Sequence, residues 1–290
     1  MGRLKKMEVG ILNIKLHPHT LAKYVELMRE LFEIGDLVQI RGDGWGTPNF
    51  IIDVIDGKPE DGLLGSFYRF THIDPTKAWL DVKSRKALVD SKGEPIPQVS
   101  SDKQPNIREV EFTFYPNGHL LFFNAKAITP GSAQKLLAEL FNNDIIKNKY
   151  SSVQVEIIST EEVVARILKI PTITRLDISI SRPNGDNLTA RKKAILKSME
   201  DQGIRRRDES ITSEKSEGIV PNQGTIDLME LATTNGSVSA TGYSGSTRMV
   251  ESTAPHPQIE TTEYDEERDT FLRALAKFSS QLLAKVVARG

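Results

Sequence analysis

Two histidines one residue apart, His17 and His19, are the first side chains whose types and spacing suit a metal site. They follow a strongly apolar segment, and α/β folds often place functional groups at the end of such a strand. Imidazole nitrogens bind transition metals, and a carboxylate such as Asp43 or Asp53 would complete the set of ligands. The alternative is a structural turn around Pro18 in which the two rings point apart.

A second candidate is the glycine-rich segment 42–46, which contains Trp45. Phosphate-binding loops lead into a helix, whereas this segment leads through Thr47 and Pro48 into another apolar strand. We therefore expect a long hairpin loop, in which Trp45 could stack on a base.

His119, which follows a tight turn, is a further candidate. Histidine side chains titrate near neutral pH and can act as general acids or bases, but the spacing of His119 identifies no partner.

Basic residues are concentrated between Arg166 and Lys215, where 12 lysines and arginines face 7 acidic residues. Such a cluster can contact phosphates and give a salt-dependent affinity for nucleic acid. The alternative is a solvated helix face that neighbouring acids neutralise. The residues concerned are Arg182, Arg191, Lys192, Lys193, Lys197, Arg205, Arg206 and Arg207.

The composition excludes several classes of protein. The chain has 290 residues and no cysteine, which excludes disulfides, iron–sulfur clusters and thiol catalysis. No apolar run approaches the roughly 18 residues that cross a bilayer, and the N-terminus lacks an apolar signal core. We therefore expect a cytoplasmic protein with no membrane partner. Nucleotide-loop, Rossmann and zinc-protease motifs are absent from the sequence, so no cofactor is expected unless the histidines bind a divalent metal.

The clearest secondary structure is a strand–helix–strand unit over residues 151–184. Apolar residues alternate with polar ones in both strands, the pattern of a strand with one buried face. Ser159 and Glu162 have the spacing of a capping box at the start of the helix between them. Further helices are predicted over 21–34, 188–201 and 271–286, the last one amphipathic. An acidic segment leads into this last helix.

These elements predict an α+β fold of mixed sheets, with helices packed on one side. We expect two domains, residues 1–147 with a loop-rich insertion at 74–105, and residues 148–290. The order of elements in the C-terminal half suggests a ferredoxin-like arrangement. Residues 265–288 either belong to the core of the monomer or form the interface of a homo-oligomer.

Five segments together resemble an uncharacterised bacterial family, a domain of unknown function. The segments are Val9 to Thr20, Ile40 to Asp43, Gly62 to Ile73, Gly118 to Phe123 and Arg175 to Asn184. The resemblance implies a bacterial origin and a genomic setting among mobile or phage-defence genes. It supplies no catalytic residues.

Three functions are compatible with these observations. The first is a phage-defence-associated module without catalysis of its own, which binds nucleic acid or a partner protein through the basic cluster and Trp45. The second is a metal-dependent nuclease or phosphodiesterase that uses His17, His19 and Asp43. The third is a structural subunit of a larger complex, which docks through its C-terminal helix.

Overall fold

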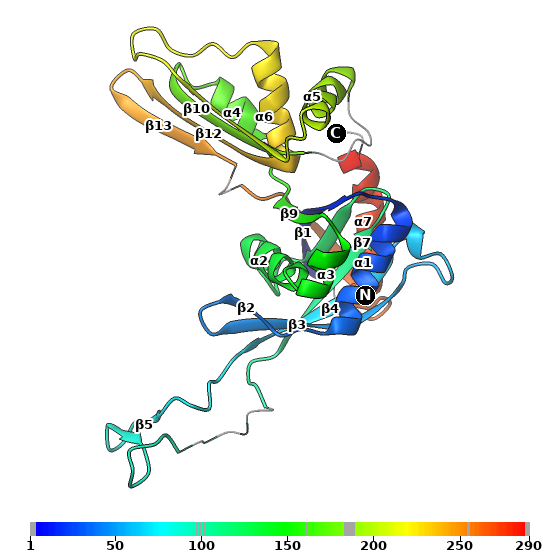
Figure 1. Cartoon of the computed structure of the whole chain (residues 1–290), viewed down its shortest axis with the longest axis vertical. Coiled ribbons are helices and arrows are strands. Elements are labelled where there is room, and N and C mark those ends of the chain that lie inside the picture. Colours follow the sequence, from blue (N-terminus) through cyan, green and yellow to red (C-terminus); the bar gives the residue numbers. More distant parts are fainter. Residues whose placement is uncertain are drawn as a thin grey trace.

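The computed structural model describes residues 4–96, 98, 100, 103–160, 162–182, 189–253 and 256–287, and contains two large sheets and one small hairpin (Figure 1). Neighbouring strands are antiparallel in every pair between the named strands of this part of the chain. Helices pack on both large sheets, which confirms the predicted α+β class. None of the described helices is long and apolar enough to cross a membrane.

The first sheet is organised around its longest strand, β1, which has 14 residues. The strand order is β14-β1-β8-β7-β4-β3-β2, and β9 pairs with the same edge of β1 as β14. The bounds are β1 (Leu4–His17), β2 (Val38–Arg41), β3 (Gly44–Asp53), β4 (Leu63–Thr71), β7 (Arg108–Tyr115), β8 (Leu120–Asn124), β9 (Ser152–Ile157) and β14 (Ile259–Asp265).

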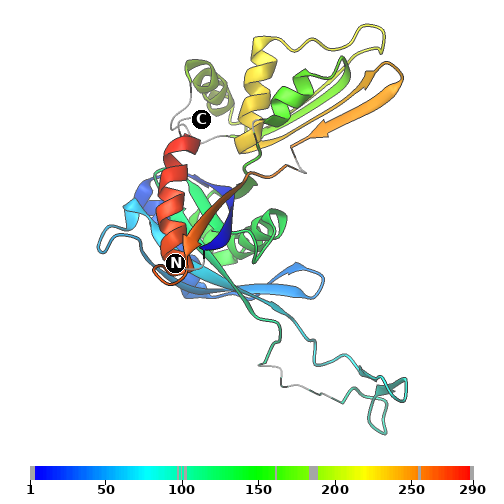
Figure 2. The ribbon, with the colours of Figure 1, turned by 180° about the vertical axis from the view of Figure 1, so that it is seen from behind.

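Helices cover both faces of this sheet. On one face, α1 (Leu21–Ile34), α2 (Pro130–Phe141) and α3 (Asp144–Lys149) pack on a core that includes Leu12, Ile14 and Leu16 of β1. On the other, α7 (Phe271–Val287) packs on Met7, Val9 and Ile11 (Figure 2). The alternation of these residues along β1 separates the two cores. The sequence predicted helices on one side of each sheet. In the first sheet α7 covers the other face, and its apolar side chains lie in the core of the monomer. A short 3₁₀ helix, η1 (Pro59–Asp61), follows β3.

The second sheet has the strand order β11-β10-β12-β13. Its helices all pack on one face, in a single hydrophobic cluster. The opposite face carries small polar side chains such as Asp177, Ser179 and Ser239. The bounds are α4 (Glu162–Leu168), β10 (Thr172–Ser181), α5 (Ala190–Asp201), β11 (Arg206–Thr212), α6 (Gln223–Asn235), β12 (Gly236–Ser244) and β13 (Thr247–Ser252).

The suggested ferredoxin-like arrangement of the C-terminal half is not formed. That fold has the order β-α-β-β-α-β, whereas the order here is β10-α5-β11-α6-β12-β13. Strand β11 pairs directly and antiparallel with β10, so α5 joins two adjacent strands and leaves no place for a strand between them.

The chain passes between the sheets twice. It leaves the first sheet after β9, near residue 158, and returns after residue 256 to form β14 and α7. The expected boundary between residues 147 and 148 falls before β9, which pairs with β1. Strand β14 occupies the acidic segment before α7, for which the sequence analysis assigned no strand. The division into two folding domains stays a prediction.

Two predicted loops contain regular structure. Gly42, with a φ of 53°, lies in a tight turn, and Gly44 already begins β3, so segment 42–46 is not a long loop. The insertion at 74–105 contains a hairpin of β5 (Trp79–Asp81) and β6 (Lys86–Leu88). Figures 1 and 2 show this hairpin standing away from both large sheets.

The return of α7 to the first sheet predicts that Leu275→Ala destabilises the whole protein. Leu275 is fully buried, so the substitution should lower the free energy of unfolding by about 3 kcal/mol. Urea denaturation would measure this loss, with Arg273→Ala on the exposed side of the helix as control. Equal stability of the two variants would contradict the packing of α7 in the monomer.

Candidate anion-binding site between the two sheets

The sheets meet where β1 faces the C-terminal end of α6. Asn13 Nδ2 donates to the carbonyl oxygen of Thr234 over 3.2 Å, and Lys15 Nζ donates to that of Asn235, also over 3.2 Å. The last carbonyls of a helix lack partners within the helix and carry the negative end of its dipole. An amide and an ammonium group from β1 therefore satisfy the end of α6.

Lys15 is completely buried at this contact. Burial lowers its pKa to about 8, and the nearby carboxylate of Glu156 acts in the opposite direction. Glu156 Oε1 also accepts a hydrogen bond from Ser181 Oγ over 2.9 Å, which links β9 to β10. The contact between the sheets therefore contains a buried cation that donates to the end of α6 and is stabilised by the charge of Glu156 on β9.

Gly236 lets the chain pass directly from α6 into β12. A Cβ atom at this position would lie 2.0 Å from the carbonyl oxygen of Ser179 on β10. Only glycine permits so close an approach of two backbones. This approach places the end of α6, including Asn235, beside β10 and above β1.

A cavity of about 290 Å³ lies beside this contact. Its ionisable lining residues, within the described part of the chain, are His17, Arg182 and Arg205. Ser151, Ser152 and Gln154 supply further polar groups, and no carboxylate is among these lining residues. Guanidinium groups offer several N–H donors in a planar arrangement that matches phosphate oxygens. The cavity therefore has the composition of an anion-binding site.

Backbone pairing brings the two arginines together. Arg182 follows the end of β10 and Arg205 precedes the start of β11, and the amide of Arg182 donates to the carbonyl of Arg205 over 2.9 Å. The Arg182 guanidinium donates through Nε and Nη2 to the carbonyl of Ile204, over 3.1 and 3.0 Å. Arg205 Nη2 donates to Ser152 Oγ over 3.0 Å. Each guanidinium is held in place and retains other N–H donors.

His17 reports the electrostatic potential of the cavity. Its pKa is lowered first by burial and then by the positive charges of Arg182, His19 and Lys15, while a backbone hydrogen bond with Arg182 acts in the opposite direction. Its Nε2 atom is buried and has no hydrogen-bond partner among the described residues. His17 is therefore neutral at pH 7, in a positive potential that an anion would relieve.

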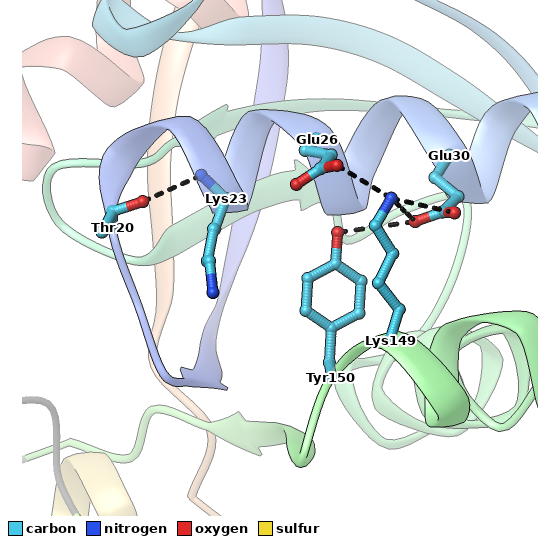
Figure 3. A network of polar contacts seen from close by, with 6 residues as sticks. All are labelled: Thr20, Lys23, Glu26, Glu30, Lys149 and Tyr150. Carbon is cyan, nitrogen blue, oxygen red and sulfur yellow. Dashed lines mark hydrogen bonds and ion pairs between the residues drawn. The ribbon is translucent and has the colours of Figure 1, made fainter.

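A polar network joins α1 to the segment that leads into the cavity lining (Figure 3). Lys149 Nζ lies 2.8 Å from Glu26 and 3.0 Å from Glu30, and Tyr150 Oη donates to Glu30 over 3.4 Å. The hydrogen bonds to these carboxylates raise the pKa of Lys149, and burial followed by the charge of Glu26 raises that of Tyr150 to about 12. The network holds α1 against the residue that precedes Ser151.

At the start of α1 the hydroxyl of Thr20 accepts from the amide of Lys23 over 3.2 Å and caps the helix. This cap sets where the segment from His17 to Thr20 joins the helix. Ser151 Oγ donates to the carbonyl oxygen of His17, so a hydrogen bond joins two residues of the cavity lining.

The predicted metal site with Asp43 is not assembled. The ring centres of His17 and His19 lie 6.1 Å apart, but Asp43 lies at the β2–β3 turn, with β4, β7 and β8 between it and β1. Asp53 instead forms an ion pair with Arg29 over 2.7 Å. Among the residues that the structure describes, no group of three or more His, Asp or Glu side chains could hold a metal ion.

The structure instead places His119 beside His19. Its ring centre lies 5.5 Å from that of His19 and 4.8 Å from that of Tyr24, on which it stacks. His119 is buried, with 5% of its surface exposed. Spacing along the chain gave no sign of this contact, because the β7–β8 turn lies a hundred residues away.

The predicted basic cluster is divided among several surfaces. Arg206 and Arg207 form ion pairs with Asp208 and Glu209, over 3.0 and 2.8 Å. Arg206 lines a second cavity of about 210 Å³, which also contains Glu156.

The remaining predicted site residues lie outside the cavity. Lys192 is buried, 3.6 Å from Glu230. Arg191, Lys193 and Lys197 are exposed on α5. Trp45 lies on β3, where its ring packs 4.6 Å from that of His72, and it does not line either cavity.

Several residues of the site were not predicted from the sequence. Lys15, Ser151, Ser152 and Gln154 stand in segments whose apolar residues dominated the pattern. The available signal is the two-residue spacing of Asn13, Lys15 and His17, which places three polar side chains on one face of β1.

The comparisons with known proteins identify a family. Residues 5–279 match the family model described as "Domain of unknown function (DUF4747)". No curated protein matches the chain.

The buried ammonium of Lys15 predicts a specific pH dependence of stability. Since its pKa is about 8 in the folded protein and near 10.5 when unfolded, the unfolded chain binds the extra proton between these values. This difference in proton binding should raise the free energy of unfolding by about 2 kcal/mol between about pH 7.5 and 9.5. Lys15→Met should lose this rise, as measured by urea denaturation at each pH.

Lys6→Met on the same strand is the matched control, because Lys6 is exposed. It should keep the pH dependence of the original chain. The same rise with pH in Lys15→Met would show that Lys15 is not buried as a cation.

Proposed function

The chain belongs to the DUF4747 family, whose description names no activity, and we propose that it is a nucleic-acid-binding module that holds phosphate groups between its two sheets. The observation that carries this proposal is the lining of the cavity, in which the cations Arg182 and Arg205 lie beside the neutral imidazole of His17, without a carboxylate among the described lining residues. Contacts to phosphate supply most of the sequence-independent affinity of proteins for nucleic acid.

The composition of the site supports recognition of the backbone and not of base sequence. Its described lining contains guanidinium, imidazole, hydroxyl and amide groups, but no Phe, Tyr or Trp side chain on which a base could stack. The exposed cations Arg191, Lys193 and Lys197 on α5 extend the positive charge of this half of the chain. A positive potential of this kind attracts a polyanion from a distance.

The cellular setting rests on the family resemblance. We place the protein in the cytoplasm of a bacterium, in a phage-defence context, as part of the same proposal. Binding without catalysis is the activity that we assign to it.

Replacing Arg205 by Gln tests the site without disturbing the core, because Arg205 is exposed. Loss of one phosphate contact should lower affinity for single-stranded and duplex nucleic acid alike, and should reduce the slope of log affinity against log salt concentration by about 1. Fluorescence-anisotropy titrations at several salt concentrations measure this slope.

Lys169→Gln is the matched control, since Lys169 is exposed in the same half of the chain and outside both cavities. It removes the same charge and should leave the slope close to that of the original protein. Equal slopes for the two variants would overturn the assignment. Each titration is repeated with magnesium and manganese and inspected for cleavage, which would argue for a nuclease.

Proton uptake by His17 should accompany binding. The pKa of His17 is lowered in the free protein, and a bound phosphate would raise it, so the complex binds more protons than the free protein. Affinity should therefore increase as the pH falls from about 7.5 to 5.5, and His17→Asn should weaken this increase.

His72→Asn provides the control for this test, because His72 packs on Trp45 and lies outside the described lining of the cavity. It should keep the pH dependence of the original protein. An unchanged pH dependence in His17→Asn would place the bound phosphate away from His17.

A further inference from the structure

The hairpin of β5 and β6 exposes apolar side chains away from both large sheets. It is inserted between β4 and β7, and Figures 1 and 2 show it projecting from the first sheet. None of the described residues from Thr71 to Ile96 is buried. Leu80 and Val82 expose 64% and 79% of their surfaces at its end.

An isolated two-stranded hairpin is only marginally stable in water, and exposed apolar clusters commonly mark sites of protein contact. The hairpin also carries charge of one sign. Between Trp79 and Val89 there are three cations, Lys83, Arg85 and Lys86, against the single acid Asp81. Its end is therefore apolar and positively charged.

A groove with the opposite charge lies at the far end of β3. It has a volume of about 850 Å³, and Phe32, Phe50 and Ile52 contribute apolar surface to it. Ile52 is 53% exposed. The groove is thus open and partly apolar.

The charge of the groove is set by two acids. Of its ionisable lining residues, Arg29 forms an ion pair with Asp53, which leaves Glu33 and Asp56 without a described cation as partner. The groove therefore matches the hairpin in apolar character and complements it in charge.

We propose that the β5–β6 hairpin of one protein molecule binds the groove beside β3 of a second copy. The hairpin cannot use the groove of its own chain. It leaves the sheet at Thr71, which pairs with Gly44, whereas the groove adjoins Asp53, which pairs with Leu63. These two ends of β4 are separated by roughly 25 Å. Figure 1 shows the hairpin projecting from the first sheet.

This proposal does not depend on nucleic-acid binding. Since each molecule has one hairpin and one groove, two copies side by side in opposite directions can exchange hairpins reciprocally and form a closed dimer. The interface would cover apolar side chains of β5 and pair the cations of the hairpin with the acids of the groove.

A charge-reversal experiment on the full chain tests the pairing. The hairpin variant carries Lys83→Glu and Lys86→Glu, and the groove variant carries Glu33→Lys and Asp56→Lys. Sedimentation velocity over a wide range of protein concentrations measures the mass. For each variant alone the dissociation constant of the dimer should rise by about tenfold or more, because like charges then face one another in both contacts. An equimolar mixture should recover the dimer, since both contacts are complementary again.

The control variant carries Glu200→Lys and Asp201→Lys on the exposed surface of α5. It changes the net charge by the same amount as the groove variant and should dimerise like the original protein. Urea denaturation verifies that every variant is folded. A monomeric original protein at all concentrations would overturn the proposal. So would a mixture of folded variants that does not recover the dimer, or a dimer that neither variant weakens.

Discussion

The placement of Lys15 in the core constrains how the two sheets meet. An ammonium group without water needs oxygen partners, and β1 cannot supply them from its own ladder. An oxygen partner comes from the other sheet, through the carbonyl of Asn235 at the end of α6, and the charge of Glu156 on β9 stabilises the ammonium further. Because Gly236 joins α6 to β12 without a loop, fixing the end of α6 also fixes the second sheet. The position of the cavity follows from this one contact.

The cationic character of the cavity has a cost in the free protein. Arg182 and Lys15 both disfavour protonation of His17, and each guanidinium is held by hydrogen bonds that limit its retreat into solvent. Glu156, which lines the neighbouring cavity, stabilises the charged form of Lys15. Phosphate would replace these repulsions by attraction, and the arginines would not have to be reorganised to reach it. An arrangement that is unfavourable without a ligand is what distinguishes this site from a solvated helix face.

The sequence predicted the elements whose signals are local. Alternation predicted both strands of segment 151–184, and the helix predicted over 21–34 forms with Thr20 as its N-cap. Long-range partners were inaccessible: β14 was not predicted as a strand, yet as an edge strand it pairs with residues 4–10. Ser159 has capping-box spacing, but its hydroxyl donates to the carbonyl of Thr253, where the two passages between the sheets lie side by side.

The same limit applies to the site. Arg182 and Arg205 were recognised as basic, but their contact depends on the pairing of β10 with β11. The cavity that they line also depends on His17 of the distant β1. His17 and Ser151 come from the first sheet and the two arginines from the second, so a bound phosphate would contact both. Whatever binds only the folded arrangement stabilises it. A ligand in this cavity would therefore act in the same direction as the Lys15 contact, and binding and the association of the sheets would be thermodynamically coupled.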